Sequence, residues 1–462
     1  MPKCDTKIEI NEEFEKALQM LEGEFQSLFI TGKAGTGKST LLEYFRQRTK
    51  KNVAVLAPTG VAALNVNGQT IHSFFLIPPN ITPNKVLDHK LPKKRKNLIK
   101  KLDMIIIDEA SMLRADLLDC IDVSLRHYRG QENEPFGGVK MVFIGDLYQL
   151  PPVVASAHER DFFSNHYGSP YFFSAKCLEH FQMNFLELEK IYRQKDDGFI
   201  ALLNKIRDNS VDAEDIEALN TRHDPHFDDE VMRDFVITLT TTNASADDKN
   251  MRELARLGTA KESFFGEIDG DFKKKNLPTA MELDIKVGAQ VMMLSNDPMG
   301  RWVNGSIGKV IGVEFDDIVG EDLLIVDING EKSVEIKKHT WKIHKYFYNE
   351  ETNQLDTEVV GSFTQFPLRL AWAVTIHKSQ GKTFDNVIID IGRGTFAHGQ
   401  IYVALSRCTS FEGIILKKRV EKRHILMDRK VDDFFNRMRY HQPLSGGEVP
   451  VQENTPVERH LW

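Results

Sequence analysis

The stretch SLFITGKAGTGKSTLLEYFRQR, residues 27–48, decides the fold class of this chain. An apolar run of strand type at 27–32 leads into the glycine-rich segment 32–39, and a helical pattern follows it. A strand, a GxxxxGKS segment and a helix in this order make a P-loop, in which backbone N–H groups at a helix N-terminus surround a phosphate. The predicted nucleotide-binding residues are Gly32, Gly35, Thr36, Gly37, Lys38, Ser39 and Thr40. In this pattern Lys38 reaches the β- and γ-phosphates and Ser39 ligates Mg²⁺.

A pair of acidic residues follows another apolar run further along the chain. MIIIDE, residues 104–109, ends a predicted buried strand with Asp108 and Glu109, and ligands of parallel α/β sheets bind at the carboxyl ends of the strands. Asp108 is the candidate to hold Mg²⁺ through water, and Glu109 is the candidate general base for an attacking water. Together with the P-loop, the pair predicts hydrolysis of a bound nucleoside triphosphate.

Apolar runs separated by helical stretches recur in two sets, and their lengths are typical of strands covered on both faces. The first set lies at 27–32, 52–58, 104–108 and 140–146, and the second at 235–243, 368–377, 386–392 and 413–418. Between about 244 and 360 the pattern changes to alternating strands separated by Gly, Asn and Asp. We therefore expect two α/β domains, a β-rich insertion in the second, and a loosely ordered C-terminal tail.

The composition is that of a folded protein without an overall basic field. The 462 residues include 60 Lys and Arg against 67 Asp and Glu, a net charge of −7, so any nucleic-acid site must be a local channel. The four cysteines, Cys4, Cys120, Cys177 and Cys408, form no metal or disulfide pattern, which favours a reducing compartment. The start MPKCDTKIEI has no apolar core of signal-peptide type and no apolar run is long enough to span a bilayer, so we expect neither a signal peptide nor a membrane-spanning segment. We expect a protein of the cytoplasm, associated with a bacterial or phage nucleoid, or of the nucleus.

Longer motifs point to a family. GDLYQLPP at 145–152, together with the P-loop and the acidic pair, resembles superfamily 1 helicases, and the segment 116–140, DLLDCIDVSLRHYRGQENEPFGGVK, resembles the signature segment of the petite integration frequency (Pif) family of superfamily 1B. The resemblance continues in the family's order through the segments 57–75, 188–194, 239–250, 302–310, 368–385 and 399–410. It implies two RecA-like P-loop domains with parallel sheets, a small wedge insertion in the first, and a β-barrel-like insertion in the second.

The resemblance also implies domain limits. The first motor domain is expected at 1–183 with the wedge at about 64–80, the second at 184–243 and 361–428, the β-rich insertion at 244–360, and a C-terminal helix and tail at 429–462. For Phe74 and Phe75 in the wedge we favour core packing over contact with a duplex. The basic runs 93–101, 273–275 and 417–424 are interpreted as solvated faces in preference to DNA-binding patches.

Functional roles follow from the same resemblance. The implied catalytic residues are Lys38, Glu109, Gln149, Arg193 and Arg407: the Gln149 amide would sense the γ-phosphate, the two arginines would stabilise its charge, and Gly381 would let the backbone approach it. The implied DNA-binding residues are Pro58, Thr59, Gly60, Thr70, His72, Ser73, Asn243, Thr375, His377, Lys378 and Ser379. A local interpretation of the second set stays open, because Thr and Ser cap helices and a single His often satisfies a carbonyl.

One position departs from the family's pattern. The family carries a Gln that reads adenine near its N-terminus, whereas NEEFEKA places Phe14 there, and Gln19 lies more than a helical turn away. Two interpretations remain: Phe14 is core of a helix, or it marks an enzyme that tolerates GTP better than its relatives do.

The resemblance implies an ATP- and Mg²⁺-dependent DNA helicase, which we expect to be a monomer when free and to have no membrane partner. The resemblance implies 5′-to-3′ translocation on single-stranded DNA, unwinding of 5′-tailed duplexes, activity that extends to G-quadruplexes and RNA–DNA hybrids, and roles in DNA repair, recombination and telomere maintenance. The alternatives are an ATP-gated single-strand clamp or remodelling module without unwinding, and a RecD-like motor subunit that needs partner chains. The sequence shows no nuclease motif that would suggest a fused DNA-cutting activity.

Overall fold

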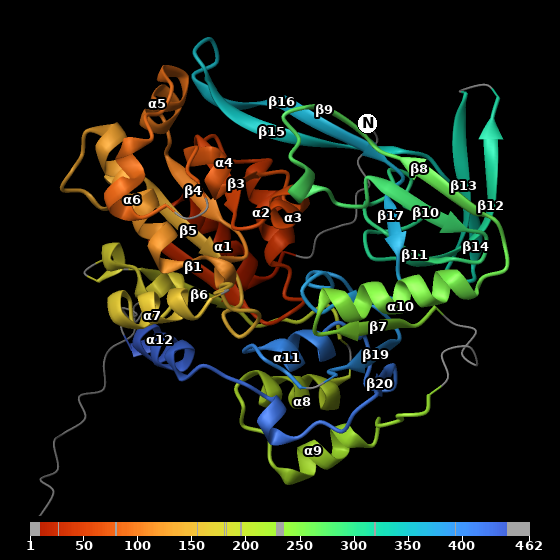
Figure 1. Ribbon diagram of the computed structural model, residues 1–462. Coiled ribbons are helices and arrows are strands. Elements are labelled where there is room, and N and C mark those ends of the chain that lie inside the picture. The colour runs from red at the N-terminus through yellow and green to blue at the C-terminus, as the bar shows by residue number, and fades with distance from the viewer. Residues whose placement is uncertain are drawn as a thin grey trace, which may run out of the picture.

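The protein is organised around two parallel sheets and a third, antiparallel region. The computed structural model describes residues 10–440 except 26, 79–80, 155, 180, 182, 195, 228–234, 318–319 and 393, so Cys4 and the predicted tail after residue 440 lie outside the described residues. In Figure 1 the first sheet and its helices lie at the left, the second sheet lies at the bottom, and the antiparallel region lies at the right.

The first sheet has six parallel strands in the order β3-β2-β4-β5-β1-β6. Its strands are β1 (Ser27–Gly32), β2 (Val53–Ala57), β3 (Gln69–Thr70), β4 (Met104–Ile107), β5 (Lys140–Ile144) and β6 (Asn184–Leu188). The helices around it are α1 (Glu12–Glu22), α2 (Lys38–Arg46), α3 (Gly60–Asn65), α4 (Ile71–Phe75), α5 (Lys93–Lys100), α6 (Ala115–Arg129) and α7 (Ala157–His166). The predicted parallel α/β architecture is thereby confirmed for this half of the chain.

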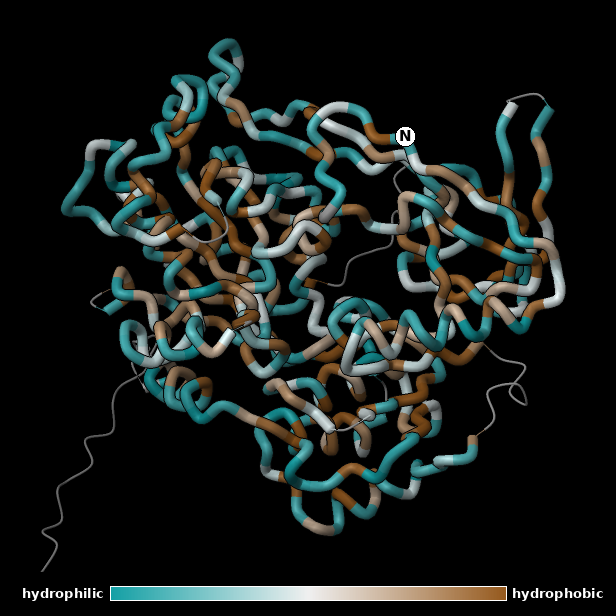
Figure 2. The backbone as a smooth tube through the Cα atoms, viewed as in Figure 1, coloured by the Kyte–Doolittle hydropathy of each residue, from teal (hydrophilic) through white to brown (hydrophobic). Residues whose placement is uncertain are grey.

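Alternate residues of the central strands enter two different cores. Leu28 and Ile30 of β1 pack with α1 and α2, whereas Phe29 faces the core formed with α6. Every residue of β1, β4 and β5 is buried, because helices cover both faces of the sheet. The continuous apolar runs of the sequence have this double burial as their cause, and Figure 2 shows such apolar segments inside the helical layers.

The predicted end of the first domain at residue 183 is wrong. Strand β6 pairs in parallel with β1, from Leu28 opposite Asn184 to Gly32 opposite Leu188. Without β6, the backbone groups on that edge of β1 would have no strand partner. The first domain therefore extends at least through Leu188.

The second sheet is also wholly parallel, in the order β18-β7-β19-β20. Its strands are β7 (Ile237–Thr240), β18 (Ala373–Thr375), β19 (Val387–Asp390) and β20 (Ile414–Leu416), and α8 (Asp197–Arg207), α9 (Ala213–Asn220) and α11 (Gln400–Leu405) accompany them. The chain leaves this sheet after β7 and returns to it at β18. This detour confirms that the β-rich segment is inserted into the second α/β domain.

After β7 the chain forms α10 (Asn243–Arg256), which packs on β7 and β18, and then enters the antiparallel strands of the insertion. These are β8 (Lys261–Phe265), β9 (Glu267–Gly270), β10 (Glu282–Lys286), β11 (Gln290–Met293), β12 (Ile307–Asp316), β13 (Glu321–Ile328), β14 (Lys332–Ile336), β15 (His339–Asn349), β16 (Gln354–Gln365) and β17 (Leu368–Leu370). They form sheets of five strands (β14-β13-β12-β11-β17), three strands (β15-β16-β9) and two strands (β10-β8). The predicted end at residue 360 is too early, because β16 runs to Gln365 and β17 pairs with β11.

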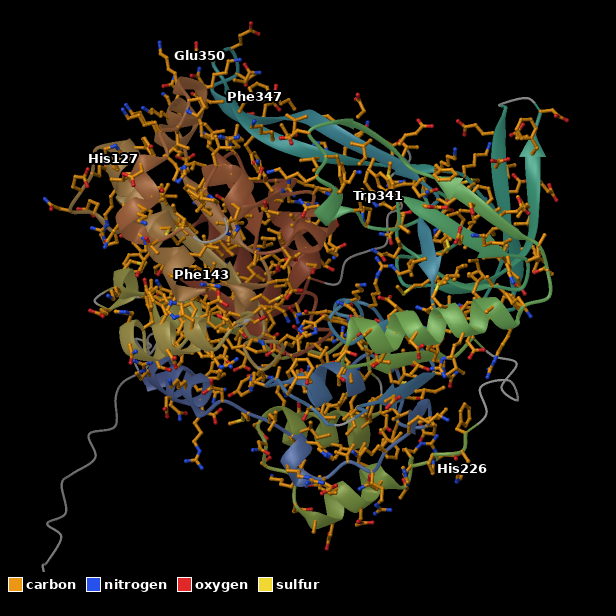
Figure 3. All side chains as sticks on the ribbon, in the orientation of Figure 1. His127, Phe143, His226, Trp341, Phe347 and Glu350 are labelled. Atoms are coloured by element: carbon orange, nitrogen blue, oxygen red, sulfur yellow. The ribbon has the colours of Figure 1, made fainter. Side chains whose placement is uncertain are left out.

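Two segments return from elsewhere to the first domain. The long hairpin β15-β16 crosses the top of the molecule toward α5 (Figure 1), with Trp341 at its base and Phe347 near its tip (Figure 3). The Tyr346 hydroxyl accepts a hydrogen bond from the Val55 backbone N–H at 3.1 Å. At the other side, α12 (Arg429–Tyr440) stacks Phe435 on Tyr148, with ring centroids 5.1 Å apart.

The wedge aromatics are core residues, as expected. Phe74 and Phe75 are 0% and 1% exposed, and the Phe74 ring meets Tyr346 edge to face. Their burial couples the wedge region to the hairpin and removes both rings from the surface that a duplex would meet.

Candidate active site and nucleic-acid groove

A cavity of about 640 Å³ opens between the two parallel domains at the carboxyl ends of their strands. It is lined by Phe14, Ala34, Gly35, Thr36, Gly37, Lys38, Ser39, Thr40, Asp108, Glu109, Gly145, Asp146, Gln149, Tyr192, Arg193, Gly381, Thr383 and Arg407. Apart from Gly32, the structure brings every predicted nucleotide-binding and catalytic residue to this one cleft.

The P-loop has the conformation that its glycines allow. Gly37, the residue just before α2, has φ of 83° and Gly35 has φ of 86°, values in the left-handed region that other residues rarely adopt. The Lys38 ammonium donates hydrogen bonds to the carbonyl oxygens of Gly32 at 2.7 Å and Lys33 at 2.9 Å. Burial lowers the pKa of Lys38, while the nearby Asp146 and Glu109 oppose the shift. Gly32 thus holds the lysine and does not line the cleft.

The two carboxylates end β4 beside the P-loop. Asp108 is 8% exposed, and Glu109 takes a left-handed backbone conformation with φ of 53°. Burial raises the pKa of both carboxyls, and for Glu109 the neighbouring Asp108 adds to the shift. A carboxylate with a raised pKa is a stronger base, which suits Glu109 for accepting a proton from water.

Ser39 and Asp108 fit a Mg²⁺ ion by their chemistry. A hydroxyl and a carboxylate are hard oxygen donors, and Mg²⁺ in nucleotide sites keeps water and phosphate oxygens as its other ligands. Both side chains line the same cleft. Within the described part of the chain, no cluster of three or more His, Cys, Asp or Glu forms a separate metal site.

Two arginines line the nucleotide cleft, Arg193 beside the P-loop and Arg407 from the second domain. Arg407, after α11, is 1% exposed, and its guanidinium donates to the Val403 carbonyl oxygen at 2.9 Å and to the Ser406 hydroxyl at 2.8 Å. Burial and the neighbouring Arg193 lower the pKa of Arg407 to about 9, so it keeps its charge at neutral pH. Arg193 lies against Gly35, where a Cβ atom in place of the glycine hydrogen would come within 2.6 Å of the arginine Cβ. Gly35 therefore makes room for Arg193 at the phosphate loop.

A buried network that the sequence interpretation missed connects the domains behind the phosphate site. The Tyr402 hydroxyl accepts a hydrogen bond from the P-loop amide of Ala34 at 3.1 Å and donates to Asp146 at 3.3 Å. Asp146 also accepts from Arg207 of α8 at 3.2 Å. Tyr402 stands in the family-like segment 399–410 and Asp146 in 145–152, so their presence in these motifs was the available signal.

The Gln149 side chain forms part of the same network. Its amide nitrogen donates to Asp146 at 3.2 Å, and its amide oxygen accepts from Gln380 at 3.1 Å. Gln380 also donates to Glu109 at 3.1 Å. Sequence reasoning selected the three residues before Gln380 and passed over this glutamine, which is the residue that contacts both the predicted sensor and the predicted base.

Phe14 belongs to the core and also to the cleft wall. It is 6% exposed, packs with Leu41, Leu42 and Phe45, and meets Tyr44 edge to face. The same side chain lines the nucleotide cleft. Phe14 therefore offers the purine ring of a bound nucleotide an aromatic surface but no hydrogen-bonding group.

A second hollow, of about 790 Å³, runs beside the cleft between both motor domains and the insertion. Of the predicted DNA-binding residues, Thr59, Thr375, His377 and Lys378 line it. Lys378 is exposed and His377 is half-buried. Pro58, Gly60, Thr70, His72, Ser73, Asn243 and Ser379 are not among its lining residues.

Several predicted hydroxyls are engaged within the protein. Thr59 and Thr70 cap α3 and α4 by accepting from the backbone N–H groups of Ala62 and Ser73. Ser379 is fully buried and donates to the Ile376 carbonyl oxygen at 2.8 Å. The prediction of a phosphate contact by the Ser379 side chain is therefore wrong, because that hydroxyl holds the shape of its own turn.

The groove has cationic and aromatic residues that the sequence interpretation did not select. Arg369, Lys382 and Trp341 line it. Burial lowers the pKa of Lys382 to about 8, with Arg369 adding to the shift, and the Lys382 ammonium donates to the Asn304 side chain. Arg369 and Lys382 stand in the family-like segment 368–385, whereas nothing in the local sequence marks Trp341.

Comparison with known proteins covers nearly the whole chain. The family model of the PIF1-like helicase matches residues 9–217, and that of the UvrD-like helicase C-terminal domain matches residues 370–410. The ATP-dependent DNA helicase Pif1 of Bdellovibrio bacteriovorus is 32% identical over 438 residues, covering 93% of this chain and 92% of that protein. The human ATP-dependent DNA helicase PIF1 is 34% identical over 421 residues, which are 88% of this chain but 61% of the human protein.

Solved structures of Pif1 helicases also resemble this chain. Bacteroides sp Pif1 in complex with ADP-AlF4 matches with a TM-score of 0.86 at 36% identity, covering 94% of this chain and 98% of that one. Bacteroides Pif1 bound to ssDNA matches with a TM-score of 0.67 at the same identity and coverage. The matched region includes both parallel sheets and the antiparallel insertion between them.

Proposed function

The chain belongs to the PIF1-like helicase family, and we propose that it couples ATP hydrolysis to 5′-to-3′ movement on single-stranded DNA and to the unwinding of duplexes. One observation carries the proposal. The turn at 377–382 contributes residues to both hollows, with Gly381 in the nucleotide cleft and His377, Lys378, Gln380 and Lys382 in the groove. A short segment common to two ligand sites can transmit the state of one to the other.

Hydrolysis uses residues from both domains. The P-loop amides and Lys38 hold the phosphates, Glu109 accepts a proton from the attacking water, and the bond between the γ-phosphorus and the bridging oxygen breaks to leave ADP and inorganic phosphate. Arg193 and Arg407 face the same cleft, where their charge stabilises the transferring phosphoryl group. Because Arg407 comes from the second domain, the catalytic set is complete only when the domains are close together.

Mg²⁺ is the expected cofactor. Ser39 and Asp108 would hold it, and the ion would neutralise charge on the β- and γ-phosphate oxygens. The protein's part is to keep both donors on the wall of the nucleotide cleft.

The nucleic-acid track is proposed to run along the 790 Å³ groove. Thr59 of the first domain and Thr375, His377 and Lys378 of the second line it. Contacts to phosphates by hydroxyl, amide and cationic groups carry no sequence information, so binding should tolerate any base sequence. Domains that approach on ATP binding and separate after hydrolysis would move these contacts along the strand.

The polarity and the range of substrates rest on the family. We propose 5′-tailed duplexes as the primary substrate, with G-quadruplexes and RNA–DNA hybrids as further substrates, and a monomer as the free form. No helix of the described residues is long and apolar enough to cross a membrane. We place the protein with the DNA, in the cytoplasm at a bacterial or phage nucleoid, or in the nucleus.

Strand displacement on matched duplexes with a 5′ tail, a 3′ tail or no tail tests the proposal. We expect ATP-dependent unwinding of the 5′-tailed duplex alone, and none by the Lys38→Ala variant, which lacks the phosphate-binding ammonium. Hydrolysis stimulated by single strands without displacement of any duplex would favour the clamp function. Absence of both activities would contradict the proposal.

A further inference from the structure

The Gln380 side chain bridges two residues of the hydrolysis machinery. Its amide nitrogen lies 3.1 Å from a carboxylate oxygen of Glu109 and 3.1 Å from the amide oxygen of Gln149. A primary amide has two N–H groups, so this geometry engages both donors. Gln380 comes from the second domain, and both acceptors come from the first.

The bridge grows out of a tight turn whose shape is fixed internally. The Lys378 backbone N–H donates to the Thr375 hydroxyl at 3.3 Å and the Ser379 N–H donates to the Thr375 carbonyl oxygen at 3.0 Å. The Gln380 N–H then donates to the His377 carbonyl oxygen at 3.3 Å. Ser379 is buried at the centre of the turn. A turn bonded in this way moves as a unit, so displacement of His377 and Lys378 displaces Gln380 as well.

The two ends of the turn face different hollows. Lys378 is exposed in the groove and Gly381 lines the nucleotide cleft. Glu109 lines both hollows, so its carboxylate lies at the point where they meet. The amide of Gln380, which lines the groove, donates its hydrogen bond to one oxygen of that carboxylate.

We propose that Gln380 is a positioning residue that restrains hydrolysis in the DNA-free protein by holding the Glu109 carboxylate in the hydrogen bond to its amide. DNA phosphates that contact His377 and Lys378 shift the turn, the bridge breaks, and Glu109 is released to accept the proton of the attacking water. The inference rests on the proposed function, because it assigns regulation to the same site. In this view, single-stranded DNA stimulates hydrolysis because it breaks the hydrogen bonds of one side chain, Gln380.

The test compares Gln380→Leu, which keeps the size of the side chain without donors, with the unmodified protein and with Gln354→Leu. Gln354 is an exposed glutamine at the start of β16. Steady-state ATP hydrolysis is measured with and without a single-stranded oligonucleotide of mixed sequence. Gln380→Leu should raise the DNA-free kcat about tenfold, the effect of losing one hydrogen bond to a charged group. The KM for ATP should change by less than about twofold, since the bridge contacts none of the P-loop residues that hold the phosphates.

The expected pattern separates restraint from a merely structural role. The DNA-stimulated kcat of Gln380→Leu should lie within about twofold of the unmodified value, since the bridge is already broken there, and Gln354→Leu should match the unmodified protein throughout. Gln380→Ala provides a second variant with the same expectation. An unchanged ratio of stimulated to basal hydrolysis, or a fall in both rates, would overturn the inference.

Failure of the inference and failure of the proposed function give different results. If the unmodified protein hydrolyses ATP, single-stranded DNA stimulates it, and the 5′-tailed duplex is displaced, the proposed function stands whatever Gln380→Leu does. If the unmodified protein hydrolyses no ATP under either condition, the proposed function itself fails. Glu109→Gln, whose hydrolysis should fall by about 10²-fold or more and should not respond to DNA, gives the rate without the base.

Discussion

The nucleotide cleft and the neighbouring groove share Glu109 and the turn at 377–382 but use their side chains differently. In the cleft the catalytic side chains face the hollow: Asp108, Glu109, Gln149 and Arg407 all line it. In the groove, many of the side chains expected to bind DNA are engaged within the protein, as Thr59 is by capping α3. A phosphate at a reacting centre needs charges at fixed positions, whereas a moving strand can be held by many weak contacts. Single changes should therefore be severe in the cleft and mild in the groove.

The largest effect is expected at Arg407. Arg407→Lys keeps a positive charge but loses the planar donors that hold Arg407 to Val403 and Ser406. Stimulated hydrolysis should fall by about 10³-fold, the scale of an arginine that stabilises a transferring phosphoryl group. Steady-state hydrolysis with a single-stranded oligonucleotide measures it. Arg419→Lys, at an exposed ion pair with Glu217, is the matched control, and a loss under tenfold would contradict the role.

A somewhat smaller loss of ATP hydrolysis is expected when the general base, Glu109, is replaced. Glu109→Gln keeps the size of the side chain but cannot accept a proton, so the hydrolysis rate should fall by about 10²-fold or more. Binding of a fluorescent ATP analogue, measured by titration, should be retained, because the phosphates are held by the P-loop. Glu314→Gln, at an exposed position of β12, should behave as the unmodified protein. Equal loss of binding and hydrolysis would show that Glu109 acts on affinity and not on the chemical step.

The difference between the two hollows also explains what the sequence could and could not predict. The P-loop and the Asp108–Glu109 pair are contiguous in the chain and follow strands, so their geometry is fixed by local spacing. The parallel sheets were readable because burial on both faces leaves continuous apolar runs. The limit at residue 183 was missed because β6 joins the first sheet by a long-range pairing with β1, which local patterns do not encode.

Groove residues were harder for a related reason. A hydroxyl that caps a helix and a hydroxyl that binds a phosphate have the same local sequence, and only the packing of Ser379 shows which it is. Trp341 reaches the groove from β15 of the insertion, far along the chain from the motifs that form the rest of it. Gln380 stands within the family-like segment 368–385, but its role depends on its hydrogen bonds to Glu109 and Gln149 of the first domain, which the local sequence does not show.

A moderate, salt-dependent effect is expected at Lys378. Lys378→Ala should weaken binding of a labelled single-stranded oligonucleotide by several-fold and make the slope of log affinity against log salt shallower by about one, the loss of one phosphate contact. Fluorescence anisotropy at several salt concentrations measures both. Lys309→Ala, exposed on β12 and not a lining residue of the groove, should leave the slope unchanged. A slope that Lys378→Ala leaves intact would remove this residue from the track.

Base selectivity should be weak, because Phe14 presents a ring and no hydrogen-bonding group to the nucleotide cleft. Hydrophobic surfaces discriminate poorly between isosteric ligands, so kcat/KM for GTP should lie within about tenfold of the value for ATP. Parallel hydrolysis assays with the two nucleotides test this. A preference for ATP of a hundredfold or more would mean that another group reads the adenine and that Phe14 serves only the core.

The smallest effect is expected at Tyr346, which joins the insertion to the first domain away from both hollows. The Val55 backbone N–H donates to the Tyr346 hydroxyl, because β3 pairs with β2 only at Leu56 and Ala57 and leaves that edge of Val55 without a strand partner. Tyr346→Phe leaves this N–H unsatisfied, and the free energy of unfolding should fall by about 1–3 kcal/mol. Chemical denaturation measures the loss, with Tyr348→Phe, whose hydroxyl bonds Asn353 in the same hairpin at an exposed site, as the control. The basal hydrolysis rate should stay unchanged in both variants, because neither ring lines the cleft; a changed rate would mean that the insertion acts on the nucleotide site through this hairpin.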